Sequence, residues 1–178
     1  MRFALRTLKE KDAPLMLEWM HDKSVTENLG ADFSSKTQED ARLFIQEAAD
    51  TNESLHLACV NEQDEYLGTV SLKHIDRKNR RAEYAICFRS AAHGSGASMY
   101  ATRGILRIAF EELELEKVYL YLYDCNGRAN RFYQKAGFVF EGRLRNQVFR
   151  NGRFIDEIWY GMIREEWQNS MEHRENNT

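Results

Sequence analysis

Alternating hydrophobic and polar positions predict most of the strands in the amino-terminal half of this chain. Phe3, Leu5 and Thr7 alternate with Arg2, Ala4 and Arg6, which predicts a first strand. Three further candidates, separated by polar turns, lie at residues 55–60, 66–74 and 81–89. Consecutive strands joined by short polar connections predict an antiparallel meander.

The carboxyl-terminal half carries a second group of strands. Residues 118–123 alternate between aliphatic and tyrosine side chains, so this strand is apolar on both faces and is expected to be central. Residues 142–149 and 154–162 flank Asn151-Gly152, which is a strong signal for a hairpin. A two-residue turn there places Phe149 opposite Phe154 and Arg150 opposite Arg153.

Helical periodicity and capping signals place helices between these strands. Asp12 and Pro14 mark the start of one helix, and the capping-box pattern from Thr37 to Asp40 starts another that runs to about Asp50. Residues 24–35 are consistent with a short helix or an irregular connection. A long helix from about Ser95 to Leu115 follows the strand that ends near Phe88, and the strand at 118–123 comes next. This order predicts a parallel crossover with a ligand cleft at the carboxyl ends of the two strands.

Length and composition narrow the class of protein. The chain has 178 residues, of which 43% are hydrophobic and 30% are charged. This fits one domain over residues 1–167, with a polar, frayed tail at 168–178. The net charge of -3 argues against a nucleic-acid partner that relies on positive charge. Without an apolar signal segment or a membrane span, the protein is expected to be cytoplasmic, with no membrane partner.

The cysteines and histidines give no metal-binding pattern. Cys59, Cys87 and Cys125 lie singly, without Cys-x-x-Cys spacing, and are expected to be buried free thiols. The five histidines show no i, i+4 pairing with each other or with cysteine. We therefore expect no metal site.

A glycine-bearing loop precedes the long helix and is the first candidate for ligand binding. Its residues are His93, Gly94, Ser95, Gly96, Ala97 and Ser98. Unpaired backbone amides at a helix N-terminus, together with the helix dipole, favour an anion such as a pyrophosphate. Two glycines before a helix are more often a plain turn, so this loop alone is a weak signal.

A second motif strengthens the functional interpretation. Asn126 suits an N-cap, Ala129, Phe132, Tyr133 and Ala136 recur on one helical face, and Gly137 supplies a stop. The Gly-x-Gly loop, the long helix, the strand and the Asn-x-x-Ala-x-x-x-Tyr-x-Lys-x-Gly-Phe motif together resemble the GNAT acetyltransferases over nearly the whole chain. Within that family the chain looks most like the RimJ/RimL-like group of ribosomal-protein, polyamine and amino-sugar acetyltransferases.

The resemblance implies a fold and a cofactor site. The fold would be α/β, with a central, mostly antiparallel mixed sheet whose parallel strand pair splays at the acetyl-CoA cleft, flanked by helices. The loop from His93 to Ser98 would hold the pyrophosphate of acetyl-CoA, the co-substrate. The backbone near Phe88 and the side chain of Asn126 would contact the pantetheine arm. The family usually has Gln or Arg where His93 stands and Gly or Ala where Ser98 stands, which puts cofactor affinity in question.

Two side chains are candidates for proton transfer. The resemblance makes Tyr133 the general acid for the leaving thiolate, although helix periodicity alone would make it a core tyrosine. Glu83 lies on the strand that leads into the loop and could accept the amine proton, while a salt bridge with Arg80 or Arg81 is an equal alternative. Direct attack in a ternary complex is favoured, because Cys125 has no paired histidine in its local sequence.

The acceptor is the least determined part of this prediction. A polyamine requires a carboxylate-lined cleft and a nucleotide-linked amino sugar requires cations, and the arginines of the hairpin slightly favour the sugar. A solvated hairpin tip is the plainer interpretation of those arginines. A protein α-amine and a non-catalytic acyl-CoA sensor are the remaining alternatives, and the apolar hairpin suggests a homodimer.

Overall fold

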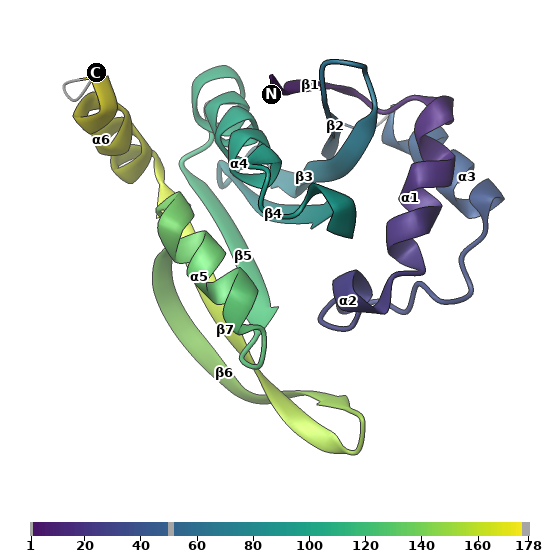
Figure 1. The fold of residues 1–178 in the computed structure, drawn as a ribbon. Helices are drawn as coiled ribbons and strands as arrows, with labels where there is room; N and C mark the ends of the chain where they lie inside the picture. Colours follow the sequence, from purple (N-terminus) through teal and green to yellow (C-terminus); the bar gives the residue numbers. More distant parts are fainter. Residues whose placement is uncertain (1, 50–51, 176–178) are drawn as a thin grey trace. The chain divides into compact units, whose positions relative to one another are not determined.

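The computed structural model describes residues 2–49 and 52–175 (Figure 1). The described chain forms two compact units. The first contains residues 2–49, 52–75 and 84–105, and the second contains residues 76–83 and 106–175. The boundary therefore falls inside one strand, β4 (Arg81–Phe88), and again inside one helix, α4 (Ala97–Arg107).

The described strands form a mixed sheet in the order β1-β2-β3-β4-β5-β7-β6. Strand β4 runs parallel to β5 (Lys117–Tyr123), with Glu83 opposite Tyr119, which confirms the predicted crossover. The pairs β1 with β2, β2 with β3, β5 with β7 and β6 with β7 are antiparallel. The predicted mixed α/β class is therefore confirmed.

In the first unit, helices pack beside the amino-terminal strands. These strands are β1 (Ala4–Thr7), β2 (Leu55–Val60) and β3 (Tyr66–Asp76), and the helices are α1 (Ala13–Met20), α2 (Lys23–Thr26) and α3 (Gln38–Ala48). A capping box between Thr37 and Asp40 starts α3 as predicted. The helix ends at Ala48, and the predicted end at Asp50 lies outside the described residues.

The core of this unit is dense and its polar groups are paired. Met16, Trp19 and Tyr66 are buried, and Trp19 Nε1 donates a hydrogen bond to Tyr66 Oη at 3.1 Å. The Tyr66 hydroxyl also bonds to Thr69 Oγ1 at 2.7 Å. Phe33, which the sequence placed in an irregular connection, packs edge-on against Trp19.

Asp12 precedes α1 as predicted, but its carboxylate does not cap the helix. It accepts hydrogen bonds from Arg6 at 2.7 and 2.8 Å and from the Lys9 amide at 2.9 Å, and it is 1% exposed. The arginine six residues upstream is a stronger partner than a neutral amide. Asp12 therefore joins β1 to the start of α1.

The second unit is built on a long hairpin. It contains α5 (Gly127–Ala136), β6 (Val139–Arg150), β7 (Arg153–Ile163) and α6 (Arg164–Glu175). Asn151 and Gly152 have φ values of 51° and 76°, so both central residues of the turn are left-handed, as a two-residue hairpin turn requires. Phe149 pairs with Phe154 and Arg150 with Arg153, which confirms the predicted register.

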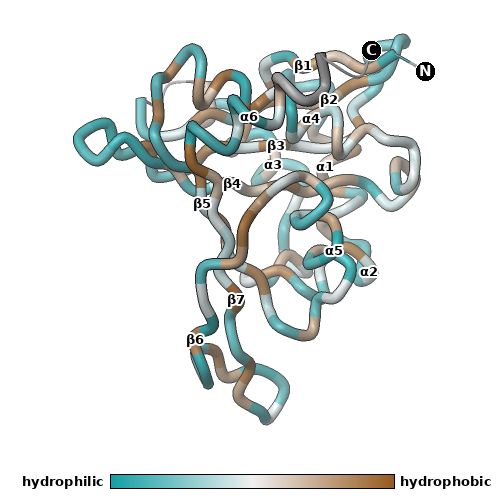
Figure 2. The backbone as a smooth tube through the Cα atoms, turned by 90° about the vertical axis from the view of Figure 1, so that its left-hand side faces the viewer, coloured by the Kyte–Doolittle hydropathy of each residue, from teal (hydrophilic) through white to brown (hydrophobic). Residues whose placement is uncertain are grey.

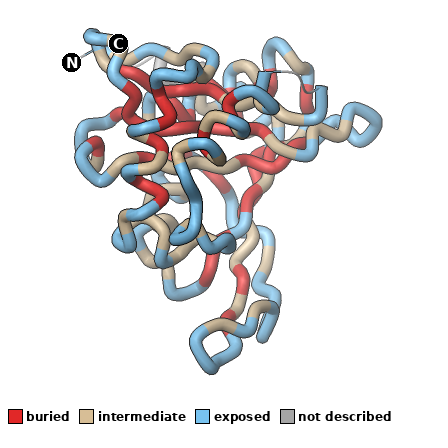
Figure 3. The backbone as a smooth tube through the Cα atoms, turned by 90° about the vertical axis from the view of Figure 1, so that its right-hand side faces the viewer, coloured by how far each residue is buried: buried red, intermediate tan, exposed pale blue. Residues whose placement is uncertain are grey.

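Hydropathy and exposure vary along this hairpin. Figure 2 shows hydrophilic and hydrophobic segments alternating along β6 and β7. The turn is exposed (Figure 3), and Phe149 and Phe154 are 65% and 61% exposed although their rings pack together. The apolar side chains at the end of the hairpin therefore remain accessible to solvent.

Several sequence predictions need correction. The faces of β5 are unequal, because Val118 and Leu120 are buried whereas Tyr121 is 43% exposed. Cys59 is buried and Cys87 half-buried, but Cys125 is exposed. Gln168 to Glu175, predicted as a frayed tail, continue helix α6, and residues 176–178 lie outside the described part.

The remaining helices are short or continue longer ones. They are η1 (Glu10–Asp12), η2 (Ser90–Ala92) and η3 (Ile108–Glu112), the last being a π-helical turn that extends α4. The long helix predicted from Ser95 to Leu115 therefore spans Ala97 to Glu112. No described helix combines the length and apolar character needed to cross a bilayer.

Candidate active site

The predicted phosphate loop lies between η2 and α4 in the first unit. Gly94 and Gly96 have φ values of 78° and 90°, a left-handed conformation that favours glycine. Their amides make no hydrogen bond within the described residues, and a Cβ on either would meet no atom within 4 Å. The Ser95 amide between them donates to the Ala92 carbonyl at 3.4 Å. Two unpaired amides beside open space at the start of a helix suit an anion.

The neighbouring residues of the loop fix its shape. Ser95 Oγ donates to the Ala92 carbonyl at 2.7 Å and accepts from the Ala97 amide at 3.2 Å. Ala97 is buried, and the Ser98 carbonyl accepts from Thr102 Oγ1 at 2.7 Å. Ser95 therefore caps α4 locally and leaves the glycine amides as the donors available to a ligand.

His93 lies at the start of the loop, near helix α2. The pKa of Asp22, the N-cap residue of α2, is lowered mainly by hydrogen bonds from Ser24 and Ser90, with a smaller electrostatic contribution from His93. The residue that departs from the family pattern thus has an acidic neighbour.

Phe88 ends β4 and is 5% exposed. A Cβ added to Gly68 on β3 would lie 2.4 Å from the Phe88 ring and 2.6 Å from the Cys87 carbonyl oxygen. The backbone of β4 therefore approaches β3 at a point where only glycine fits, and the Arg89 amide bonds to the Leu67 carbonyl just beyond it. At the other end of the strand, Arg81 to Glu83 pair with β5.

Helix α5 of the second unit carries Asn126 and Tyr133. Asn126 is the N-cap, and its side chain accepts from the Ala129 amide at 3.1 Å. Gly137 ends the helix with φ 100°, as predicted. The Tyr133 ring is half-buried, with edge contacts to Phe132 and Phe138 at 5.4 and 5.9 Å between ring centroids.

Glu83 is a buried carboxylate, 8% exposed, on the part of β4 that belongs to the second unit. The arginines considered as its partners make other ion pairs: Arg81 with Asp76 at 3.6 Å and Arg80 with Glu116 at 2.9 Å. Glu83 pairs in register with Tyr119, whose pKa is raised by burial and then by the charge of Glu83. The carboxylate therefore faces a phenol.

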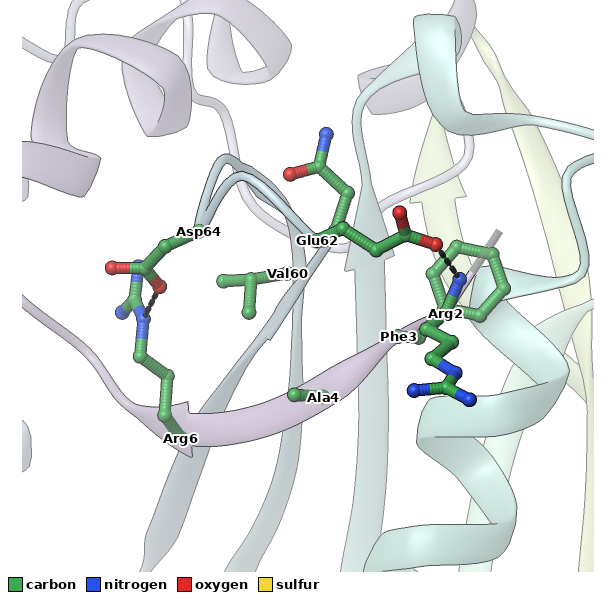
Figure 4. A pocket seen from close by; sticks show the side chains of 8 residues that line it. Arg2, Phe3, Ala4, Arg6, Val60, Glu62 and Asp64 are labelled. Atoms are coloured by element: carbon green, nitrogen blue, oxygen red, sulfur yellow. Dashed lines mark hydrogen bonds and ion pairs between the residues drawn. The ribbon is translucent and has the colours of Figure 1, made fainter.

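A separate pocket lies in the first unit (Figure 4). It has a volume of ≈ 460 Å³ and is lined by Arg2, Phe3, Ala4, Arg6, Val60, Asn61, Glu62 and Asp64. Arg6 and Asp64 in its wall pair with each other at 2.5 Å, and none of the predicted site residues lines it. No described group of three or more His, Cys, Asp or Glu side chains is arranged to hold a metal ion.

Comparison with known proteins identifies the family. The model of the family described as acetyltransferase (GNAT) domain matches residues 2–139. The chain belongs to the GNAT acetyltransferase family. Its relatives include a putative ribosomal N-acetyltransferase and spermidine N(1)-acetyltransferases, consistent with the RimJ/RimL-like group. This GNAT protein is an N-acetyltransferase, and acetyl-CoA is its co-substrate.

Individual relatives resemble it to different extents. An uncharacterized N-acetyltransferase from a Bacillus subtilis (strain 168) prophage is 28% identical over 83% of this chain and 82% of its own length. A spermidine N(1)-acetyltransferase of Escherichia coli (strain K12) is 34% identical, over 53% of this chain and 50% of its own. The structure of a Vibrio cholerae spermidine N-acetyltransferase in complex with CoA and spermine has a TM-score of 0.84 at 22% identity, covering 93% of this chain and 98% of that one.

The structure of this GNAT acetyltransferase also reveals a surface that sequence analysis missed. In strand register, Glu83 lies opposite Tyr119, Tyr121 opposite Trp159, and Tyr123 opposite Glu157. The Trp159 ring stacks on Tyr121 at 5.3 Å and on Tyr119 at 5.9 Å. We call Glu83, Tyr119, Tyr121, Trp159 and Glu157 the acidic aromatic face. The alternation of tyrosines at 119, 121 and 123 was its visible signal.

The opposite face of these strands packs on α5. Tyr160 is buried, accepts from Gln134 Nε2 at 3.1 Å and donates to Asn130 Oδ1. Because side chains alternate along β7, Tyr160 points away from Trp159 and Glu157. Helix α5 therefore covers one face, and the acidic aromatic face is the other.

Proposed function

We propose that this acetyltransferase modifies a cationic primary amine of the polyamine class. The observation that carries the proposal is the acidic aromatic face, where two buried carboxylates, Glu83 and Glu157, flank a stack of aromatic rings. Carboxylates pair with ammonium groups, and aromatic faces attract cations through their quadrupole. The spermidine acetyltransferases among its relatives support the same class of acceptor.

The arginines of the hairpin give less support to a nucleotide-linked acceptor than their number suggests. Arg143 donates to Asp124 at 2.9 Å and to Asp156 at 2.5 Å. The pKa of Asp156 is lowered by the Asn146 amide and by Arg143. Arg150 lies over the Tyr123 ring at 5.7 Å. At least two of these arginines are therefore engaged within the chain.

An amino sugar is the second candidate acceptor, because the stacked rings of Trp159 and Tyr121 also offer a flat surface to a sugar ring. Tyr121 is 43% exposed, so this surface is accessible. A neutral sugar with one amine has no use for a second carboxylate. Glu157 therefore favours the polyamine over the sugar.

Two residues of the second unit carry the proposed proton transfers. Glu83 accepts the proton that the attacking amine loses as its nitrogen bonds to the acetyl carbonyl carbon. The Tyr133 phenol, neutral at pH 7, donates its proton to the departing sulfur. Acetyl-CoA supplies the thioester, so the chain itself needs no covalent intermediate.

Cofactor binding is assigned to four parts of the chain. The Gly94 and Gly96 amides, at the start of α4, face the pyrophosphate. Residues His93, Ser95, Ala97 and Ser98 hold the loop in shape. The backbone near Phe88 pairs with the pantetheine arm, and Asn126 contacts it from α5.

The proposal is tested by measuring thiol release from acetyl-CoA against a panel of polyamines, monoamines, amino sugars, nucleotide-linked amino sugars and peptides. Thermal shift by acetyl-CoA is measured in parallel, because it reports the cofactor site independently of the acceptor. We expect turnover with polyamines, and we expect Tyr133→Phe to lose turnover while keeping the acetyl-CoA shift. Turnover confined to sugars or peptides would reject the polyamine.

A further inference from the structure

Glu157 on β7 is a largely buried residue whose carboxylate pairs with no group among the described residues. It is 8% exposed, and within residues 2–49 and 52–175 its side chain makes no hydrogen bond or ion pair. Its carboxylate oxygens are not among the buried atoms that lack a hydrogen-bond partner in the described chain, so they keep access to solvent. An accessible carboxylate that pairs with no described residue can receive a cation from outside the chain.

The surroundings of Glu157 are aromatic and lie on the acidic aromatic face. Its register partners are Tyr123 on β5 and Leu144 on β6, and Trp159 is two residues along the same strand. The pKa of Tyr121 is raised by burial and then by the charges of Glu83 and Glu157. The Glu157 charge thus acts on the same stack of rings that Glu83 borders.

One cation is already near this end of the face. The Arg150 guanidinium lies 5.7 Å from the centroid of the Tyr123 ring, on the strand that pairs with β7. It shows that the aromatic rings here accept a positive charge. Arg150 is also an alternative source of positive charge for Glu157, because its guanidinium could compensate the carboxylate electrostatically without a direct contact.

The strand register sets the separation of the two carboxylates. Glu83 is opposite Tyr119 and Glu157 is opposite Tyr123, on the two strands that flank β5. Four residues along the strand and two strand spacings place their Cα atoms about 16 Å apart. A ligand that reaches from one to the other must be long, and the rings between them suit methylene groups and cations.

We propose that Glu157, together with Tyr121 and Trp159, binds the distal ammonium group of a long diamine or polyamine while the amine at the other end is acetylated beside Glu83. This assignment rests on the proposed function, and it names Glu157 as the residue that distinguishes polycations from monoamines. The distal ammonium supplies the counter-charge that Glu157 lacks in this chain.

The test compares kcat/KM for spermidine, spermine and a series of α,ω-diamines with that for monoamines of the same chain length. We expect wild-type protein to prefer the longer diamines. Glu157→Gln should lower kcat/KM for polyamines at least about thirtyfold, because an ion pair in a buried setting is lost. Monoamines should change less than about twofold. Glu165→Gln, an exposed carboxylate on α6, is the matched control and should leave both unchanged.

Thermal stability supplies a second readout. Without amine, Glu157→Gln should unfold at a temperature close to that of wild type, because the substitution breaks no hydrogen bond or ion pair within the described residues. The variant should lose the stabilisation by spermine but keep that by acetyl-CoA. Arg150→Gln should keep the polyamine preference.

The outcomes separate the two proposals. If Glu157→Gln reduces activity on monoamines and polyamines alike, or if spermine still stabilises it as it does wild type, Glu157 is not the distal site. If Arg150→Gln abolishes the preference while Glu157→Gln keeps it, the alternative compensation by Arg150 holds. If wild type acetylates no amine in the panel, the proposed function fails instead.

Discussion

Asp12 in the first unit and Glu157 in the second are both acidic residues with little exposed surface, but among the described residues Asp12 has a charge partner and Glu157 has none. Arg6 holds Asp12 with two hydrogen bonds, and the Lys9 amide adds a third. Glu157 is 8% exposed and has no such partner among the described residues. The Asp12 carboxylate is satisfied inside the fold, whereas the Glu157 carboxylate is left for a cation from outside the chain.

The same contrast separates two tryptophans. Trp19 Nε1 donates to Tyr66 Oη, whereas Trp159 Nε1 is buried without a hydrogen-bond partner in the described chain. The other buried side-chain atoms without a hydrogen-bond partner in the described chain belong to Arg42 and Arg164, so Trp159 Nε1 is the one that lies on the acidic aromatic face.

The largest effect is expected when the pair at Asp12 is broken. Asp12→Asn should lower the free energy of unfolding by about 3 kcal/mol, because it removes the buried charge partner of Arg6, which is then left with Asp64 alone. Urea denaturation measures this loss, and Glu157→Gln is the comparison. Equal losses in the two variants would remove the distinction between them.

A large effect on catalysis, with little effect on the fold, is expected at Glu83. Glu83→Gln should lower kcat about a hundredfold or more, because the amide cannot accept the amine proton. Its acetyl-CoA thermal shift should match that of wild type. Normal turnover in this variant would make Glu83 a structural carboxylate like Asp12.

The two tryptophans give a smaller and more pointed comparison. Trp19→Phe should cost about 2 kcal/mol of unfolding free energy, because it loses a buried hydrogen bond and packing volume. Trp159→Phe should cost less than about 1 kcal/mol, because removing an unsatisfied donor offsets the lost packing. Chemical denaturation of both variants measures the two losses of unfolding free energy. A larger loss for Trp159→Phe than for Trp19→Phe would contradict this prediction.

The smallest effect concerns the pH dependence of Asp64. Hydrogen bonds from Lys11 and then Arg6 hold the pKa of Asp64 well below its usual range. A carboxyl whose pKa is lowered by folding contributes stability above its unfolded pKa of about 4 and loses it as the pH falls below that value. Asp64→Asn should therefore melt below wild type at pH 7, and the difference should shrink towards pH 2. Asn tolerates the φ of 58° found at this position.

Local signals in the sequence predicted the elements whose geometry is local. The Asn151-Gly152 turn fixed the hairpin register, and the Thr37 capping box fixed the start of α3, because both depend on residues a few positions apart. The strand-helix-strand order gave the parallel pair. The spacing of a family motif indicated the loop as the candidate cofactor site and Tyr133 as the candidate general acid.

Features that depend on distant residues could not be predicted this way. Asp12 was predicted to cap α1 because capping rules consider only the residues of the helix and its ends. Its actual partner, Arg6, lies on the preceding strand. Glu157 could not be predicted as a site residue because its neighbours lie on β5 and β6, and the sequence of β7 alone does not reveal them. The exposure of Tyr121 likewise depends on what covers the sheet.

The division of strand β4 between the two units has a consequence for local opening and hydrogen exchange. Its first residues, Arg81 to Glu83, belong to one compact unit, and Tyr84 to Phe88 belong to the other. Cooperative units of a protein open with their own free energies, so adjacent amides along one strand can exchange hydrogen at rates set by different units. The step between Glu83 and Tyr84 would then mark, at single-residue resolution, where one folding unit ends and the next begins.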